Sequence, residues 1–228
     1  MDYIHPVKFF RRFFPVNCYL VEERNELTLI DAALPFSTNK IMSTAEKIGK
    51  PITRIVLTHA HADHVGALDH LKHLLPNASV YISKRDAKLL KGDRSLYPNE
   101  KKTPIRGGIP KNIQTKPAHF LKENDQIGSL IAISTPGHTP GSMSFLDSRT
   151  NAIIAGDSFQ TRGGIAVSGQ LKWTFPFPAL ATWNKDMAIE SAKKIESYQP
   201  TLLAVGHGED LKNPTQHIRK AIEEATKK

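Results

Sequence analysis

Residues 58–64 read Thr-His-Ala-His-Ala-Asp-His and offer four side chains that can bind a metal ion: His59, His61, Asp63 and His64. They follow a short apolar run and precede a segment with helical periodicity. On an extended strand end His59 and His61 point to the same side, because side chains alternate with period two. Asp63 and His64 lie where the chain turns into the helix. The corner can therefore present two imidazoles to one ion and a carboxylate with an imidazole to a second; the alternative is a polar loop with a chance cluster of histidines.

Three later residues have the same character, each in a glycine-containing turn directly after an apolar strand: His138, Asp157 and His207. Taken alone, His138 or His207 would more often be a structural turn histidine. Neutral imidazoles and carboxylates together suit Zn²⁺, Fe²⁺ or Mn²⁺. Metal coordination lowers the pKa of bound water from 15.7 to about 7, which supplies a nucleophile at neutral pH without a catalytic serine or cysteine.

In the type and order of these seven residues the chain resembles the metallo-β-lactamase-fold hydrolases, from about residue 16 to residue 209, and within them the glyoxalase II and lactonase-like branch. The resemblance implies an α+β fold, a four-layer αββα sandwich with the metals at one edge. It implies that one ion is held by His59, His61 and His138, and the other by Asp63, His64 and His207, with Asp157 bridging them.

The same resemblance implies a mechanism. A hydroxide shared by two divalent ions attacks the substrate, and Asp63 and Asp157 are the expected catalytic residues. We expect Zn²⁺, with Fe²⁺ or Mn²⁺ as alternatives. Asp31 resembles the family's early aspartate, for which we expect a buried structural role, and Thr58 and Thr139 are expected to orient neighbouring ligands.

The order of elements supports two halves, each built of strands, helices and polar loops at strand ends. Strands are expected at residues 16–21, 26–30, 54–57, 79–83, 127–134, 143–146, 152–155 and 201–205. Helices are expected at residues 37–50, 65–75, 84–90, 183–198 and 214–228. Residues 93–116 are rich in Lys, Arg, Pro and Gly and are predicted to be a surface excursion.

Composition sets broader bounds. The 228 residues are enough for a single domain, which we assign to residues 1–228. The lone Cys18 excludes an intrachain disulfide and fits a reducing compartment. No apolar run reaches the length of a signal-peptide core or a membrane span, so we predict a cytoplasmic protein without a membrane partner. The formal net charge of +9 would attract anionic partners.

We expect a small-molecule substrate with an ester-type bond, a lactone or a thioester. Lactonases of acyl-homoserine lactones commonly carry a tyrosine where this chain has Gln160, which argues against that particular substrate. The irregular segment 159–182 contains Trp173, Phe175 and Phe177, which could line an apolar pocket, and Arg162, which could receive a carboxylate; ordinary loop packing is the alternative.

Two other functions stay open. A phosphodiesterase or nuclease is favoured by the net charge and by the basic residues of segment 84–116. A non-catalytic metal-binding module is the third reading, although the ligand set is complete. The oligomeric state is not specified by the sequence.

Overall fold

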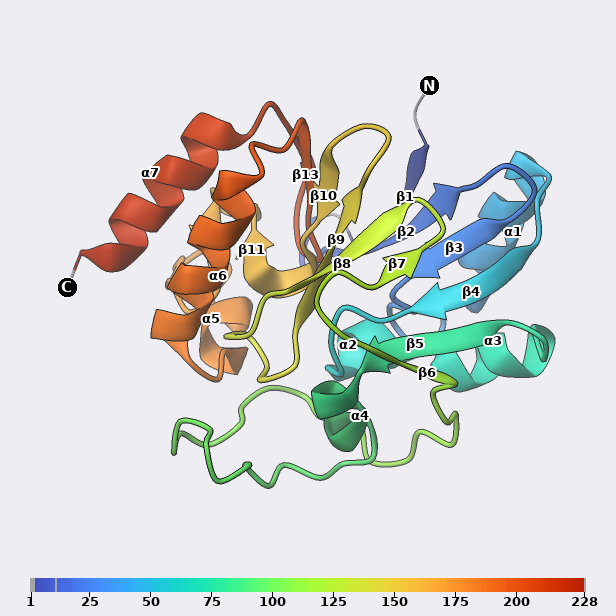
Figure 1. The fold of residues 1–228 in the computed structure, drawn as a ribbon, viewed down its shortest axis with the longest axis horizontal. Coiled ribbons are helices and arrows are strands. Elements are labelled where there is room, and N and C mark those ends of the chain that lie inside the picture. The colour runs from blue at the N-terminus through green and yellow to red at the C-terminus, as the bar shows by residue number, and fades with distance from the viewer. Residues whose placement is uncertain (1–2, 11, 228) are drawn as a thin grey trace.

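The computed structural model describes residues 3–10 and 12–227. Six strands of the first half form one sheet, in which β1, β2 and β3 pair antiparallel and β3 to β6 pair parallel (Figure 1). Their bounds are β1 (Ile4–Phe9), β2 (Val16–Glu22), β3 (Leu27–Ile30), β4 (Ile52–Val56), β5 (Ser79–Ser83) and β6 (His119–Leu121).

Six strands of the second half form the other sheet, in the order β14-β13-β10-β9-β8-β7. Their bounds are β7 (Gln126–Ile127), β8 (Leu130–Ser134), β9 (Met143–Asp147), β10 (Ala152–Ile154), β13 (Leu202–Ala204) and β14 (Leu211–Lys212). A separate two-stranded ribbon pairs β11 (Phe159–Gln160) with β12 (Ala166–Val167).

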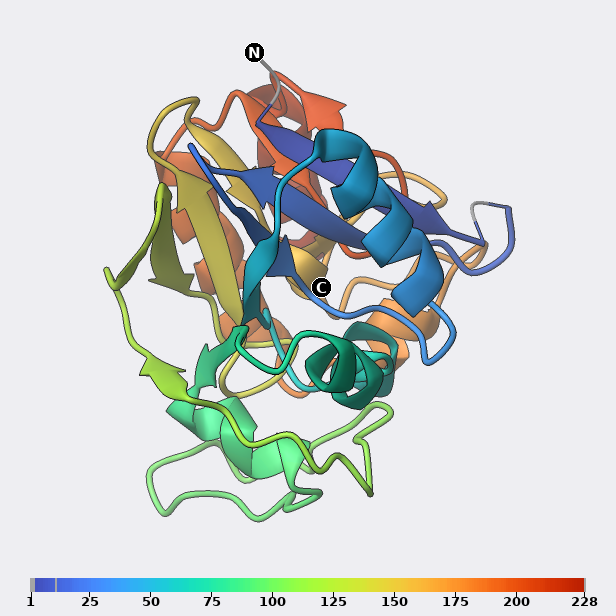
Figure 2. The ribbon, with the colours of Figure 1, turned by 90° about the vertical axis from the view of Figure 1, so that its right-hand side faces the viewer.

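Helices cover the outer face of each sheet (Figures 1 and 2). The first sheet carries α1 (Thr38–Ile48), α2 (Ala62–Val65), α3 (Leu68–Leu74) and α4 (Lys84–Leu90). The second carries α5 (Phe177–Ala181), α6 (Lys185–Ser197) and α7 (Thr215–Thr226), and a single 3₁₀ turn spans Gly156–Ser158. The predicted αββα sandwich is confirmed.

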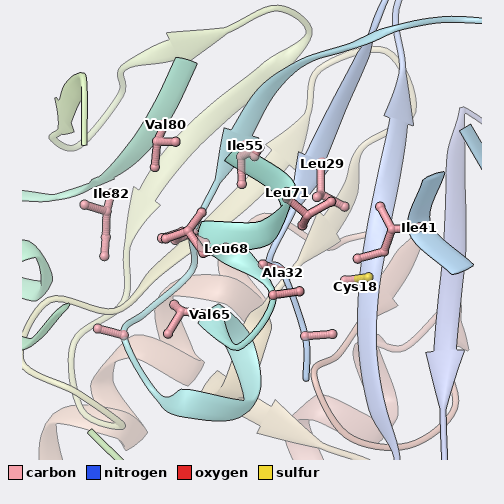
Figure 3. Close-up of a cluster of buried hydrophobic side chains, with 14 of the residues drawn as sticks. Cys18, Leu29, Ala32, Ile41, Ile55, Val65, Leu68, Leu71, Val80 and Ile82 are labelled. Carbon is pink, nitrogen blue, oxygen red and sulfur yellow. The ribbon is translucent and has the colours of Figure 1, made fainter. Parts of the chain in front are cut away.

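Alternation along the strands explains why the layers stack. In β2, Cys18 and Leu20 face the helices, whereas Tyr19 and Val21 face the other sheet. Figure 3 shows the helix-side cluster, in which Leu68 and Leu71 of α3 lie among side chains of the first sheet. Both faces of each sheet are therefore apolar, and each half needs a helical layer outside and the other sheet inside.

The direction of the strands gathers the polar loops at one rim. The strand β8 is antiparallel to β9, which is antiparallel to β10, and β10 is parallel to β13. The three strands β8, β10 and β13 therefore end on the same side, and the loops after them carry His138, Asp157 and His207. The loop after β4 carries the cluster at residues 58–64.

Most predicted elements are found within one or two residues, and the excursion at 93–116 contains neither helix nor strand. The predicted helix 65–75 starts too early, because α2 ends at Val65 and α3 begins only at Leu68. Between them the Gly66 amide donates to the Ala33 carbonyl (2.8 Å) rather than within a helix, and a Cβ at Gly66 would lie 2.6 Å from Pro35. The predicted strand 127–134 is two strands, β7 and β8, joined by a tight turn. The sequence did not predict α5, the strand β1 or the short strands β6, β11, β12 and β14.

Among the described residues, no helix has the length and apolar character needed to span a bilayer.

Candidate metal centre

Five imidazoles and two carboxylates meet at this rim. The ring centroids of His59, His61 and His138 lie 4.6–4.8 Å apart, and those of His59 and His64 lie 4.1 Å apart. His207 Nε2 lies 3.0 Å from Asp157 and 3.5 Å from Asp63. Three sets of possible ligand atoms lie within metal-binding reach of one another: His59 with His61 and His138; His59 with His64 and Asp157; Asp63 with His64 and His207.

Local backbone structure explains how one short segment contributes four of these groups. His61 is extended (φ −74°, ψ 149°) and caps α2, so His59 and His61 precede the helix, whereas Asp63 and His64 lie in its first turn. This is the geometry expected from the spacing. A Cβ at Gly206 would lie 2.1 Å from Asp157 Oδ1 and 2.7 Å from His64, so only glycine allows the β13 loop to approach this closely.

The outer nitrogens of His61 and His138 fix their tautomers. His61 Nε2 donates to the Arg106 carbonyl (3.1 Å), which leaves a lone pair on Nδ1. Thr182 donates its hydroxyl to the Pro178 carbonyl (2.7 Å) and so accepts from Ser168 (2.8 Å), and Ser168 in turn accepts from His138 Nδ1 (2.9 Å). The inner lone pairs of His61 Nδ1 and His138 Nε2 then face each other at 2.9 Å, an arrangement that a cation or a proton between them makes favourable.

The other three imidazoles are oriented in the same way. Thr58 donates its hydroxyl to Asp31 (2.7 Å), so the 3.0 Å bond from His59 Nδ1 to that hydroxyl has the histidine as donor. His64 Nδ1 donates to Asp31 (2.8 Å). His207 Nδ1 donates to the carbonyl of Pro15 (2.6 Å). Every outer nitrogen is thus held by the chain, and every inner nitrogen points into the cluster, as in metal-ligating histidines.

Three atoms at the centre are buried without a hydrogen-bonding partner among the described residues. These atoms are His59 Nε2, His64 Nε2 and Asp157 Oδ1. A buried polar atom without a partner is unfavourable by about 1–3 kcal/mol. Metal ions between the inner nitrogens and Asp157 would satisfy all three atoms, so the residues present fit the metals that the sequence predicts.

Electrostatics divides the cluster into a neutral and a charged part. Burial lowers the pKa of His59, His61 and His138, and neighbouring imidazoles lower the pKa of all three further. Burial also opposes charge on His64 and His207, but two neighbouring carboxylates together outweigh it and raise the pKa of each. These are Asp157 and Asp31 beside His64, and Asp157 and Asp63 beside His207. Burial alone would raise the pKa of Asp157, yet His207 and His64 hold it well below its usual range. Metal binding at this second part would therefore release protons.

Asp31 has the structural role expected from the sequence. It is buried with a left-handed backbone (φ 62°), and it accepts from the Thr58 amide, the Thr58 hydroxyl and His64. It links the end of β3 to both parts of the cluster.

Sequence reasoning missed Asp86, a second buried carboxylate that holds the ligand-bearing loops together. Its buried carboxylate accepts from the Ala60 amide (3.0 Å), the Thr139 hydroxyl (2.7 Å) and the Gly141 amide (2.8 Å). It thereby ties the first histidine loop to the loop that carries His138. Burial raises the pKa of Asp86 to about 6. Thr139 acts through this carboxylate rather than on an imidazole.

The surface excursion also reaches the site, which its composition did not indicate. Arg94 donates to the carbonyls of Ile105 (3.2 Å) and Gly107 (3.1 Å), and the Gly108 carbonyl accepts from the Ala62 amide (2.7 Å). The carbonyl between them, that of Arg106, is the one that orients His61. Gly107 has φ 85°, and a Cβ there would lie 2.3 Å from His61 Nε2.

A cavity of about 480 Å³ opens onto the cluster. Asp63, Asp157, His61, His138 and His207 form its polar floor. Its walls are mainly apolar, and three segments supply most of their side chains: Phe14; Leu34 and Pro35; Phe177, Pro178, Leu180 and Ala181. Ala62, Gly107 and Gly108 complete the lining. No Lys or Arg is among the described residues that line it.

The segment 159–182 lines this cavity with one of its three predicted aromatic residues, together with Pro178, Leu180 and Ala181. Phe177 lines it, and Phe175 packs behind it against His207 (5.5 Å between ring centroids). Trp173 is 88% exposed and lies outside the lining. The expectation that Arg162 receives a substrate carboxylate is not supported, because its guanidinium donates to the carbonyl of Arg12 (2.6 Å) and does not line the cavity.

Comparison with known proteins agrees with this geometry. The family profile of the metallo-beta-lactamase superfamily matches residues 11–207, a range that includes all seven predicted ligands. The chain belongs to the metallo-beta-lactamase superfamily. It is 61% identical over 219 residues to the uncharacterized protein YobT of Bacillus subtilis, covering 96% of this chain and 94% of that one.

More distant members of the superfamily carry more informative names. The chain is 28% identical to the probable metallo-hydrolase YflN of Bacillus subtilis, with 84% of this chain and 80% of that one covered. The crystal structure of TTHA1623 in a di-iron-bound form superimposes with a TM-score of 0.66, at 25% identity, over 92% of this chain and 96% of that one. These matches do not single out the glyoxalase II or lactonase branch, which stays a prediction.

Proposed function

We propose that this chain is a metal-dependent hydrolase that cleaves an ester-type bond, a lactone or thioester, in a small molecule with an apolar acyl group. One observation carries the proposal. Five histidines, each with its outer nitrogen held by the chain, turn their inner nitrogens toward Asp157 on the floor of an apolar cavity. The relatives described as metallo-hydrolase and as di-iron-bound support the same reading.

The residues divide between two ions as the sequence resemblance implies. His59, His61 and His138 would hold one ion, and Asp63, His64 and His207 the other, with Asp157 between them. Metal ions in such a site polarise a carbonyl oxygen and make bound water acidic enough to act as a nucleophile near neutral pH. Histidine with carboxylate suits Zn²⁺, Fe²⁺ and Mn²⁺, of which we favour Zn²⁺.

The two carboxylates differ in what they can do. Asp157 is buried and lies within 3.3 Å of His64, His138 and His207, so it holds the cluster together. Asp63 lines the cavity and its side chain is 23% exposed, which makes it the carboxylate that can accept a proton from an incoming water or from the substrate.

The cavity favours a carbonyl ester over a phosphodiester. A phosphodiester carries a charge that arginine or lysine normally binds, and the described residues lining the cavity include neither. Several basic residues that suggested a nuclease are engaged elsewhere: Arg85 with Glu100 (2.5 Å), Lys88 with Asp93 (3.4 Å) and Arg94 with backbone carbonyls.

Initial rates on matched lactone, thioester and bis-aryl phosphodiester substrates test the proposal, with metal-stripped protein and protein reloaded with zinc, iron or manganese. Turnover of a lactone or thioester should require metal and should fall by at least about 100-fold in Asp157→Ala, since several kcal/mol of stabilisation depend on the ions. The control is His217→Ala, which removes an exposed histidine of α7. Phosphodiester turnover without carbonyl turnover would refute the proposed bond type.

A further inference from the structure

Exposed apolar side chains gather around the mouth of the cavity. Five such residues belong to the three segments that form its walls: Phe10 (56% exposed), Phe13 (85%), Phe36 (60%), Phe177 (51%) and Leu180 (61%). We call these five residues the collar. An exposed apolar patch is unfavourable in water and usually marks a binding surface.

Contacts between side chains join the collar into one surface. The rings of Phe10 and Phe36 lie 5.4 Å apart, and those of Phe14 and Phe177 lie 5.1 Å apart. The Arg162 guanidinium bonds the Arg12 carbonyl and so ties the β1–β2 loop to the segment after β11. Figure 2 shows this loop beside the orange segment that leads into α5.

The collar is also continuous with the cavity. Phe177 and Leu180 belong to both, Phe36 directly follows the wall residues Leu34 and Pro35, and Phe13 directly precedes Phe14. A long apolar group that fills the cavity and extends out of its mouth would therefore lie on further apolar surface. A bulky partner seated on the collar would instead cover the entrance to the candidate metal centre.

We propose that the collar binds the outer part of a long, unbranched apolar acyl chain, so that the substrates are esters or thioesters of medium to long acyl groups. This inference rests on the proposed function and narrows its substrate class. The carbonyl lies at the metal ligands, the first methylenes lie against Phe14, Leu34 and Phe177, and the later ones lie on the collar.

Chain length provides the test. A methylene moved from water to an apolar surface should raise kcat/KM about fourfold. Thioesters from acetyl through butyryl, hexanoyl, octanoyl, decanoyl and lauroyl should show this rise beyond the length that the cavity alone holds. In the double variant Phe13→Ser/Phe36→Ser the ratio of kcat/KM for lauroyl over butyryl should fall at least about tenfold, since both rings are lost from the chain's path.

Phe120→Ser is the control, because Phe120 is also an exposed phenylalanine (51%) but lies on β6 and lines no part of the cavity. This variant should keep the wild-type ratio. If short acyl thioesters are hydrolysed but kcat/KM is flat with chain length, the collar inference fails and the proposed function stands. Equal loss of both substrates in the double variant would also overturn the inference.

A binding measurement keeps the inference testable if no ester is turned over. Linear alcohols from butanol to dodecanol should bind the wild-type protein with a dissociation constant that falls about fourfold per methylene in calorimetry, and the double variant should lose this gain for the longer alcohols. Two other outcomes would refute the proposal if no chain-length effect is seen. Dimerisation in sedimentation that the double variant abolishes would assign the collar to a second copy of the chain. Binding to phosphatidylcholine vesicles that the double variant abolishes would assign it to a membrane.

Discussion

Asp31→Asn should weaken metal binding chiefly through the tautomer of His64, and it also removes the acceptor of the Thr58 hydroxyl that orients His59. The wild-type carboxylate accepts the Thr58 amide on Oδ1 and both the Thr58 hydroxyl and His64 Nδ1 on Oδ2. Asparagine tolerates the backbone angle of 62° at this position. Its oxygen can keep the bond to the Thr58 amide, but its NH₂ group then faces His64 Nδ1, which must accept instead of donate. The imidazole proton moves to Nε2, the nitrogen that faces the metal.

The magnitude follows from what the two orientations of the amide can satisfy. With the NH₂ toward His64, metal affinity at Asp63, His64 and His207 should fall 10–100-fold, the usual effect of losing such a partner. With the amide reversed, two donors meet at the Thr58 amide, which destabilises the fold by about 1–3 kcal/mol.

Competition of Zn²⁺ binding against a chromophoric chelator measures the first effect, and imidazole nitrogen NMR reports the His64 tautomer. Asp69→Asn is the control, because Asp69 also accepts three bonds, from the Gln114 amide and from the amide and hydroxyl of Thr115, and none from an imidazole. Wild-type affinity for both ions in Asp31→Asn, with unchanged stability, would refute the tautomer argument.

Three further perturbations follow from the geometry. Arg94→Ala should release the carbonyls of Ile105 and Gly107, on either side of Arg106, and lower metal affinity at His61 about tenfold. Lys111→Ala should leave the metal content unchanged in elemental analysis. Equal affinity in the two variants would show that Arg94 does not hold the Arg106 carbonyl in place. Because burial raises the pKa of Asp86 to about 6, its neutral form favours the metal-free fold below about pH 4, and this contribution is lost as pH rises to 6. The free energy of unfolding of the wild-type protein relative to Asp86→Asn should therefore decline by up to about 3 kcal/mol across that range, and denaturant titrations showing a rise would reverse the assignment. Burial raises the pKa of the Cys18 thiol, so a chromogenic disulfide reagent should label it only as the protein unfolds, and rapid labelling of native protein at neutral pH would show that the thiol is accessible.

The sequence was sufficient to predict which side chains gather at the candidate metal centre, because their chemistry lies in side chains at a recognisable spacing. His59 and His61 alternate on an extended segment, and His138, Asp157 and His207 follow strands that end at one rim. The fold was predictable from the order of strands and helices in the two halves, together with the resemblance to a known family. The groups that orient the imidazoles were mostly not predictable, because many are backbone carbonyls such as those of Pro15 and Arg106, which any residue could supply.

Asp86 shows a second limit. In the sequence it stands in the helical stretch Lys84–Leu90 among charged residues and looks like part of a solvated face. Asp86 is fully buried in the structure, because the loop at residues 139–141 folds onto the start of α4. The Thr139 hydroxyl and the Gly141 amide of this loop donate to its carboxylate. Contacts between residues more than fifty positions apart along the chain leave no trace in local patterns.

Anomalous diffraction from crystals grown with Zn²⁺ would locate the metal ions of this protein. We expect two peaks on either side of Asp157, one among His59, His61 and His138 and the other among Asp63, His64 and His207, and neither peak in Asp157→Ala crystals. A saturated crystal with no peak at this rim, or with its zinc bound elsewhere on the chain, would contradict this expectation.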